Sequence, residues 1–489
     1  MKIDNVKVCK MGNKLGICLS KFYFQKGRSV QIKVIKENKE KVFLAKFNRI
    51  IVLRKDMKNS LSLKHQDLIT IELGEIKNLS RTSELFKENM IDMLFLIPEK
   101  TSRGYEIVVT EFEENNEAWL RIWYSHKRGS GKQLEIRRFI EIRSFGSLLG
   151  QYQAEGTKHN NTNKKFRVEF KNKLVKEHSE FLYSFSNIGI PANMFVFRFL
   201  CNPNKISGKE IDRLVKEFEA ANNCKVKISY SNSKGIGFES VIRHTLLTEI
   251  ILYGMDKVRN LLANSKIYSY NELCLADNFL AKLLTGDGTL DVRCKRRDFP
   301  ELNIKIVDQD LNYLDDYSKI LRNAGFHPRI NQKRIFVKSS CSFRNLLYLY
   351  NIKAFKNSNN WSKLLTAIAL CLRGRRYYTY SRFLYFADYE KFGTSVISKG
   401  FQIQSNMASD WLNNKVKENL IMKNNYNSWS LTPEGKNLSE ILKVWSKDYQ
   451  NLTNLKGLKD PFALLETLKI KKLKRLAKQL AESNRSLLL

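Results

Sequence analysis

Two short stretches of this chain end alike, each with a small residue, an acid and a glycine. Residues 148–156 read LLGQYQAEG and residues 280–288 read LAKLLTGDG. A glycine just after an apolar helical run is typical of a helix end, which places Glu155 and Asp287 at helix C-termini. Because the helix macrodipole is already negative there, a carboxylate at that end is unfavourable without a nearby cation. Two such acids in matching contexts predict a cation site.

Cleavage of a phosphodiester bond is one chemistry that needs such acids. A metal-bound water attacks phosphorus, and a second charge stabilises the leaving oxygen. Mg²⁺ binds through one or two carboxylates together with phosphate oxygens. Two helices that pack closely, with small residues such as Gly150 and Ala154 one turn apart at the contact, would bring both acids to one phosphate. Without a cation the two carboxylates repel, and one of them holds its proton.

The composition indicates what kind of partner to expect. The chain has 489 residues, 43% of them hydrophobic, and a formal net charge of +36. This length predicts several domains, and this charge favours a polyanion, with nucleic acid ahead of an anionic membrane. No apolar run reaches the roughly 20 residues that span a bilayer, and the N-terminus lacks the apolar core of a signal peptide. The eight cysteines and six histidines are scattered, which excludes a disulfide framework, a zinc finger and a histidine-based nuclease motif.

The elements around the two acids follow a repeated order. In the first half, residues 141–265, we expect a strand at 166–170, a helix at 174–185, and strands at 194–200 and 226–230. In the second half, residues 266–375, we expect a strand at 302–307, a helix at 311–324 and more strand at 328–337. Helix–strand–strand–helix–strand–strand, repeated twice, predicts an α+β fold with internal pseudo-symmetry.

The segments that flank these halves differ from them in predicted secondary structure. Residues 1–80 contain repeated short hairpins, and residues 81–140 start with a helix to about Leu96 before turning β-rich. Within the latter, residues 126–132 form a basic hairpin tip. Residues 376–445 predict a helix at 405–421, a polar hairpin at 422–430 and a second helix capped by Thr432. Residues 446–489 form a basic helical tail, with a lysine-rich helix at 461–482.

The paired stretches resemble the two motifs of the LAGLIDADG homing endonucleases, over roughly residues 141–375. The resemblance implies two pseudo-symmetric αββαββα halves and a site that binds Mg²⁺ or Mn²⁺. It implies that Glu155 and Asp287 bind the metal, with help from the backbone carbonyls of Ala154 and Gly286. One departure is Lys282, which stands where the first motif has Gly150 and puts the close helix contact in question.

The family also suggests three further site residues. Lys158 stands three positions after the first acid, where some members carry a lysine that stabilises phosphate charge; the second motif has Leu290 there. Asn172 and Gln309 follow the strands that precede the second helix of each half, where a polar residue often positions water. An ordinary surface role is equally open for Lys158, Asn172 and Gln309.

The flanks resemble DNA-binding modules. Residues 1–80 resemble two copies of the AbrB-like swapped-hairpin module, through Gly12-Asn13-Lys14-Leu15-Gly16-Ile17 above all; a small β domain with no particular partner is the alternative. Residues 376–445, with the signature Leu431-Thr432-Pro433-Glu434-Gly435, resemble a winged helix-turn-helix.

The sequence therefore predicts a monomeric, metal-dependent, sequence-specific double-strand DNA endonuclease of homing type. We expect it in a prokaryotic cytoplasm, associated with DNA and not with a membrane. A non-cleaving transcriptional regulator on the same fold and an RNA-splicing maturase are the alternatives. Retention of both acids favours the enzyme, because a pure binder gains nothing from negative charge facing phosphate.

Overall fold

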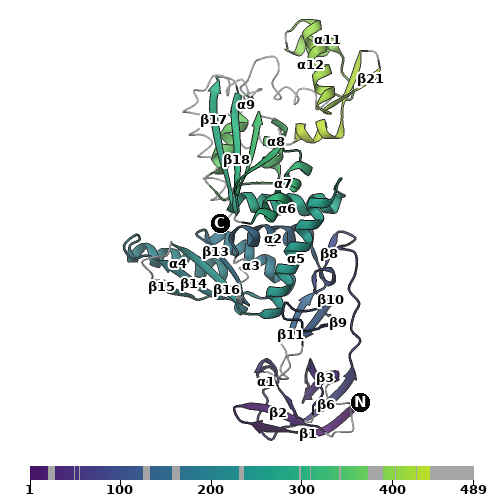
Figure 1. Cartoon of the computed structure of the whole chain (residues 1–489), viewed down its shortest axis with the longest axis vertical. Coiled ribbons are helices and arrows are strands. Elements are labelled where there is room, and N and C mark those ends of the chain that lie inside the picture. Colours follow the sequence, from purple (N-terminus) through teal and green to yellow (C-terminus); the bar gives the residue numbers. More distant parts are fainter. Residues whose placement is uncertain are drawn as a thin grey trace. The chain divides into compact units, whose positions relative to one another are not determined.

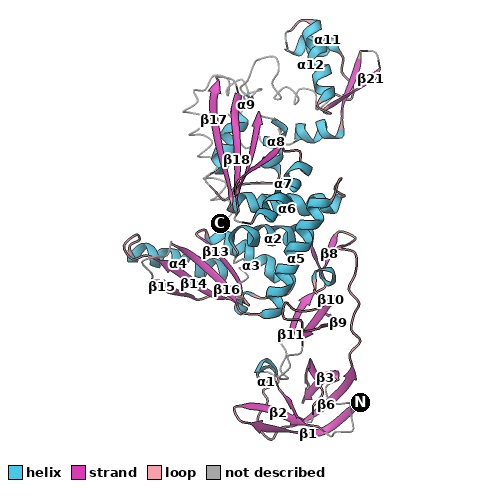
Figure 2. Cartoon of the chain, in the orientation of Figure 1, coloured by secondary structure: helices cyan, strands magenta, loops and turns pink. Residues whose placement is uncertain are grey.

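The computed structural model contains two compact units, residues 1–258 and residues 259–489. Both mix helices with sheets, which confirms the predicted α+β class (Figures 1 and 2). The structure describes residues 1–19, 28–48, 50–53, 55–124, 133–156, 166–230, 236–296, 299–308, 310–340, 343–358, 360–372, 389–401, 403–425 and 427–440. The basic tip at 126–132 and the predicted helix at 461–482 lie outside these residues.

The N-terminal part is a six-stranded sheet with the order β4-β3-β6-β1-β2-β5. Its strands are β1 (Lys2–Met11), β2 (Lys14–Cys18), β3 (Ser29–Lys36), β4 (Lys39–Lys46), β5 (Ile50–Val52) and β6 (Leu68–Glu75), with the short helix α1 (Lys55–Ser60). Apolar side chains alternate along β3 and β6 and meet in one core. Strand β1 pairs with β6, and β4 pairs with β3. The six strands thus form two triplets, β1–β3 and β4–β6. The first strand of each triplet pairs with the last strand of the other triplet.

The predicted helix ending near Leu96 is wrong. The segment instead forms β7 (Phe86–Lys87), β8 (Met90–Asp92) and one 3₁₀ turn, η1 (Met93–Leu96). Consecutive apolar side chains from 93 to 97, except Phe95, are buried, so no single helical face exists. Asp92 caps the 3₁₀ turn by accepting from the Leu94 amide and pairs with Arg138 at 2.9 Å, which fixes the short element. The β-rich remainder is as predicted, with β9 (Ile107–Glu114), β10 (Glu117–Tyr124), β11 (Gln133–Arg137) and β12 (Phe139–Glu141).

The first half contains one helix more than predicted. Its elements are α2 (Ile142–Glu155), β13 (Val168–Asn172), α3 (Val175–Ile188), η2 (Ala192–Met194), β14 (Val196–Cys201), α4 (Gly208–Asn222), β15 (Val226–Tyr230), β16 (Gly237–Ile242) and α5 (Thr245–Asn264). The sheet order is β13-β16-β14-β15, and the intervening α4 makes β15 run parallel to β14. Strand β16 was missed because Gly237, Glu239 and Ser240 interrupt its apolar pattern.

The second half follows the predicted order. Its elements are α6 (Tyr270–Gly286), β17 (Gly288–Arg296), β18 (Phe299–Val307), α7 (Leu311–Asn323), β19 (Pro328–Asn331), β20 (Arg334–Ser340), α8 (Phe343–Asn351) and α9 (Asn360–Leu372). The sheet is antiparallel throughout, with the order β17-β18-β20-β19. A capping box between Ser269 and Glu272 starts α6.

The C-terminal elements are two helices and a hairpin. They are α11 (Thr394–Phe401), α12 (Ser405–Lys417), β21 (Ile421–Asn425) and β22 (Ser428–Leu431), followed by a helix at 433–440. The predicted helix at 405–421 is too long, since Asn419 adopts a positive φ of 57° and ends it. Thr432 caps the last helix as predicted, because its Oγ1 accepts from the Gly435 amide at 3.0 Å.

Candidate active site

Both motif acids lie at helix C-termini, as the sequence predicts. Glu155 is the last residue of α2, and Asp287 caps α6. The motif glycine of the first half does not end its helix in the left-handed conformation, since Gly156 has a φ of −78°. A Cβ on Gly156 would overlap the carbonyl oxygen of Tyr152, and one on Gly288 would overlap that of Leu284. In both halves, glycine is required because the chain turns tightly over the carbonyl four residues earlier.

Each motif glycine pairs with the strand that leads to the next helix. Gly156 forms a bridge with Phe170 in β13, and Gly288 pairs with Ile306 in β18. Both pairings are antiparallel. The two acids therefore stand in the same relation to the local backbone of their own half.

This correspondence identifies a residue that sequence reasoning missed. Two positions beyond Phe170 and Ile306 lie Asn172 and Asp308, and α3 and α7 each begin three residues later. Asn172 Oδ1 accepts from the amide two residues on at 2.9 Å, and Asp308 Oδ1 does the same at 3.1 Å. Asp308 therefore occupies the place of Asn172, one residue before the predicted Gln309, which lies outside the described residues. The signal in the sequence was the matching distance to the following helix.

In the first half, a second carboxylate faces Glu155. Burial and the charge of Glu177 raise the pKa of Glu155. Glu177, in the first turn of α3, is only 3% exposed. Gln151 Nε2 donates to Glu177 Oε2 at 2.8 Å. Gln151, one turn before Glu155, thus holds the second acid in place. Nothing in the sequence indicated this role for Glu177, because an acid in the first turn of a helix is expected there as a favourable surface charge.

In the second half, two carboxylates flank a buried tyrosine. Burial above all, then the carboxylate of Asp308 and also that of Asp287, raises the pKa of Tyr317 well above its ordinary value. The Tyr317 hydroxyl has no hydrogen-bond partner in the part of the chain that the structure describes. Asp287 and Asp308 therefore belong to one electrostatic environment.

A buried histidine supports Asn172. His178 is fully buried, with Nδ1 2.8 Å from Ser240 Oγ and Nε2 3.2 Å from the Asn172 carbonyl oxygen. Because a carbonyl only accepts, Nε2 carries the proton and Nδ1 accepts from the serine hydroxyl. Burial lowers the pKa of His178 to about 4, so the ring is neutral near pH 7.

The remaining predicted site residues are placed as follows. Ala154 and Gly286 lie in the last turns of α2 and α6, where helical carbonyls lack later amides as partners. Lys282 is half-buried, and Leu290 is fully buried in β17. Lys158 lies outside the described residues. Glu155 lies in the first compact unit and Asp287 in the second, and the meeting of the two acids at one site stays a prediction.

The face of the first-half sheet opposite α3 carries exposed cations over buried acids. Phe170 stacks on Phe181 of α3 at 4.3 Å, so the neighbouring Glu169 and Lys171 point to the opposite face. The side chains of Glu169 and Glu239 are 1% and 7% exposed, whereas Lys171 is 47% exposed. Lys171 Nζ lies 2.6 Å from Glu169 and 3.2 Å from Glu239. The acids hold the cation in place and leave the outer surface positive.

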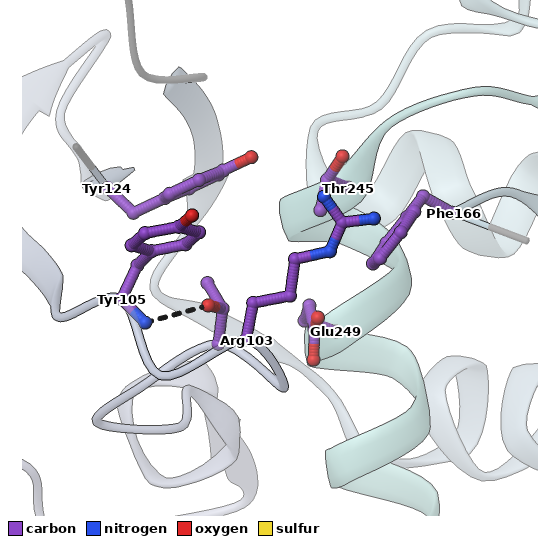
Figure 3. A pocket seen from close by; sticks show the side chains of 7 residues that line it. Arg103, Tyr105, Tyr124, Phe166, Thr245 and Glu249 are labelled. Atoms are coloured by element: carbon purple, nitrogen blue, oxygen red, sulfur yellow. Dashed lines mark hydrogen bonds between the residues drawn. The ribbon is translucent and has the colours of Figure 1, made fainter. Parts of the chain in front are cut away.

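A small hollow in the first unit lies beside this half. It measures about 30 Å³ and is lined by Thr101, Arg103, Tyr105, Tyr124, Phe166, Thr245 and Glu249 (Figure 3). Arg103 lies over the Phe166 ring at 4.2 Å, and the Tyr105 and Tyr124 rings stack at 5.9 Å. A space of that size holds water and not a nucleotide, so we interpret it as a structural contact.

Comparison with known proteins finds no matching family model and no matching curated protein. Within the described residues, no group of three or more histidine, cysteine and acidic side chains is arranged to hold a metal ion. No helix in the described ranges is both long and apolar enough to cross a membrane.

Proposed function

We propose that this chain is a metal-dependent, sequence-specific endonuclease that cuts double-stranded DNA, of the LAGLIDADG homing type. One observation carries the proposal: each half places one acid at the end of a helix, immediately before a glycine that pairs with the next strand. Two equivalent acids, one per half, suit the two strands of a duplex.

The strand orders support pseudo-symmetric halves. In the first half β13-β16-β14 are antiparallel neighbours, and in the second half β18-β20-β19 have the same order and directions. The polar residue that follows the first strand of each set, Asn172 or Asp308, forms the same turn before the same helix. Fold alone does not establish chemistry, so the proposed cleavage activity depends on the two acids and not on the strand order.

The donor set fits a hard divalent cation such as Mg²⁺ or Mn²⁺. Glu155 and Glu177 are a pair of like charges that a cation would relieve, and Asp287 and Asp308 both act on the pKa of the buried Tyr317. Glu155, Asp287 and the carbonyls of Ala154 and Gly286 would hold the metal, which supplies a nucleophilic water and charge stabilisation. Asn172 and Asp308 would position water, and Lys158 would stabilise the charge on the phosphate.

The flanking modules would add affinity. In the N-terminal sheet, β1 pairs with β6 and β4 with β3, which is the exchange expected of two swapped-hairpin copies. Helix α12, the β21–β22 hairpin and the capped helix at 433–440 suit a winged helix-turn-helix. With a net charge of +36, we propose a monomer that binds duplex DNA in a prokaryotic cytoplasm.

Cleavage of plasmid libraries with Mg²⁺ tests the proposal. The wild type should nick and then linearise a subset of plasmids. Asp287→Asn and Glu155→Gln keep side-chain shape and remove charge, so cleavage should fall by roughly 10²-fold or more while DNA binding persists. Glu210→Gln, at an exposed acid paired with Arg213 in α4, is the matched control and should cut normally.

Each other outcome points to a different conclusion. Specific binding without cleavage by the wild type would favour the transcriptional regulator. Preferred binding to a folded intron RNA would favour the maturase. Normal cleavage by Asp287→Asn would remove this residue from the metal site.

A further inference from the structure

The first half carries a helix and a strand that the second half lacks. Beyond the three shared strands, β15 joins the outer edge of β14 in parallel, and α4 makes the connection. In the second half β19 is the edge strand and turns directly into β20. Both sheets have four described strands, but the fourth strand of the second sheet, β17, lies beside β18, whereas that of the first sheet, β15, lies at the edge away from β13. The two sheets therefore differ at the edge away from β13 and β18.

Strand β15 is held firmly in place. Ser207 caps helix α4, because its Oγ accepts from the Glu210 amide, and the helix buries Ile211 and Phe218. Phe218 stacks on Phe238 of β16 at 4.3 Å, on the same side of the sheet as α3. The added strand thus belongs to the packed body of the first half, and its opposite face joins the cationic face.

The pairing of β14 with β15 adds one residue, Lys227, to the cationic face. Lys171 lies opposite Glu239, Glu239 opposite Arg198, and Arg198 opposite Lys227. Cross-strand neighbours share a face, so these four side chains form one row across all four strands. Arg198 pairs with Glu239 at 3.6 Å, whereas Lys227 is exposed and forms no ion pair within the described residues.

We propose that β15 lengthens the contact of the first half with duplex DNA, with Lys227 binding a phosphate for which the second half has no corresponding strand. The proposal rests on the DNA target proposed above and specifies its form: an asymmetric site, with a contact at the β15 edge that has no counterpart in the second half. A further strand adds about 4.8 Å, and a duplex carries one phosphate charge per about 1.7 Å, so the extension covers one or two base pairs. Charge complementarity favours this partner, because the row exposes cations over buried acids.

The experiment compares Lys227→Ala with Lys216→Ala, which removes the same charge from the exposed side of α4. The probe is a duplex selected with the wild type from a random library. Lys227→Ala should weaken binding about three- to tenfold, reduce the slope of log affinity against log salt by about one, and shorten the hydroxyl-radical footprint at one end only. Lys216→Ala should match the wild type, and equal thermal unfolding of both variants would show intact folding.

Three results would overturn the inference. If the wild type binds its selected duplex but Lys227→Ala behaves as Lys216→Ala does, the β15 contact is wrong and the proposed function stands. If the wild type selects no duplex at all, both fail. Shortening at both ends of the footprint would also contradict an asymmetric contact.

Discussion

At the level of single residues, the two halves carry different residues three positions after the motif acid. Lys158 follows the first acid by three positions, and the equivalent Leu290 is fully buried in the core of the second half. Because Leu290 is buried and uncharged, this position of the second half supplies no positive charge. The chemistry proposed for the two DNA strands is therefore unequal.

This inequality predicts a nicked intermediate. Lys158→Met keeps most of the aliphatic length and removes the ammonium, so cutting of one strand should slow by about 10²-fold while the other is little changed. A time course on supercoiled plasmid would then accumulate the open-circular form. Equal slowing of both strands, without that form, would assign Lys158 to binding or folding.

At the level of elements, the sequence predicted those helices and strands that depend on the local pattern of apolar residues and glycines. The motif helices, β13, α3, β18 and α7 follow from apolar periodicity and glycine positions. Helix α4 was missed, although its Ser207 cap is visible in the sequence. Strand β16 was also missed, because Glu239 and Ser240 are polar residues buried by partners far away in sequence, Lys171 and His178. The failed helix before Leu96 has the same cause, since Arg138 fixes Asp92 from 46 residues away. Asp308 was identified from the strand pairing, although its distance to the following helix, which matches that of Asn172, was present in the sequence.

The buried His178 predicts a pH-dependent stability for the first half. Its pKa is about 4 in the folded chain against an ordinary 6.5, so the unfolded chain binds more protons between these values. Stability is fully present above about pH 6.5 and is lost as pH falls toward 4, by up to about 3 kcal/mol. Urea unfolding from pH 4.5 to pH 7.5 measures this slope. His178→Gln keeps polar atoms but does not titrate, so it should flatten the slope; an unchanged slope would assign the pH dependence to other groups.

At the level of the whole molecule, charge and modular organisation act together. A net charge of +36 over 489 residues suits the proposed DNA partner, because such binding would depend on release of counterions. The β21–β22 hairpin places Lys423 over the Trp429 ring at 5.8 Å, which holds a cation on the wing. Glu155 lies in the first compact unit, and Asp287 and the β21–β22 hairpin both lie in the second, but no residue of the hairpin is part of either acid motif. Affinity and cleavage should therefore be separable by truncation.

Removal of residues 376–489 tests that separation. Without the wing and the basic tail, DNA binding should weaken, and the slope of log affinity against log salt should fall by about 0.9 for each phosphate that the shortened chain no longer neutralises. The acids and their flanking strands are retained, so the shortened chain should still cut its target at high protein concentration with Mg²⁺. Filter binding from 50 to 300 mM salt, with cleavage measured in parallel, resolves both effects. An unchanged slope would remove the winged helix from the DNA interface, because each released counterion contributes to that slope regardless of sequence.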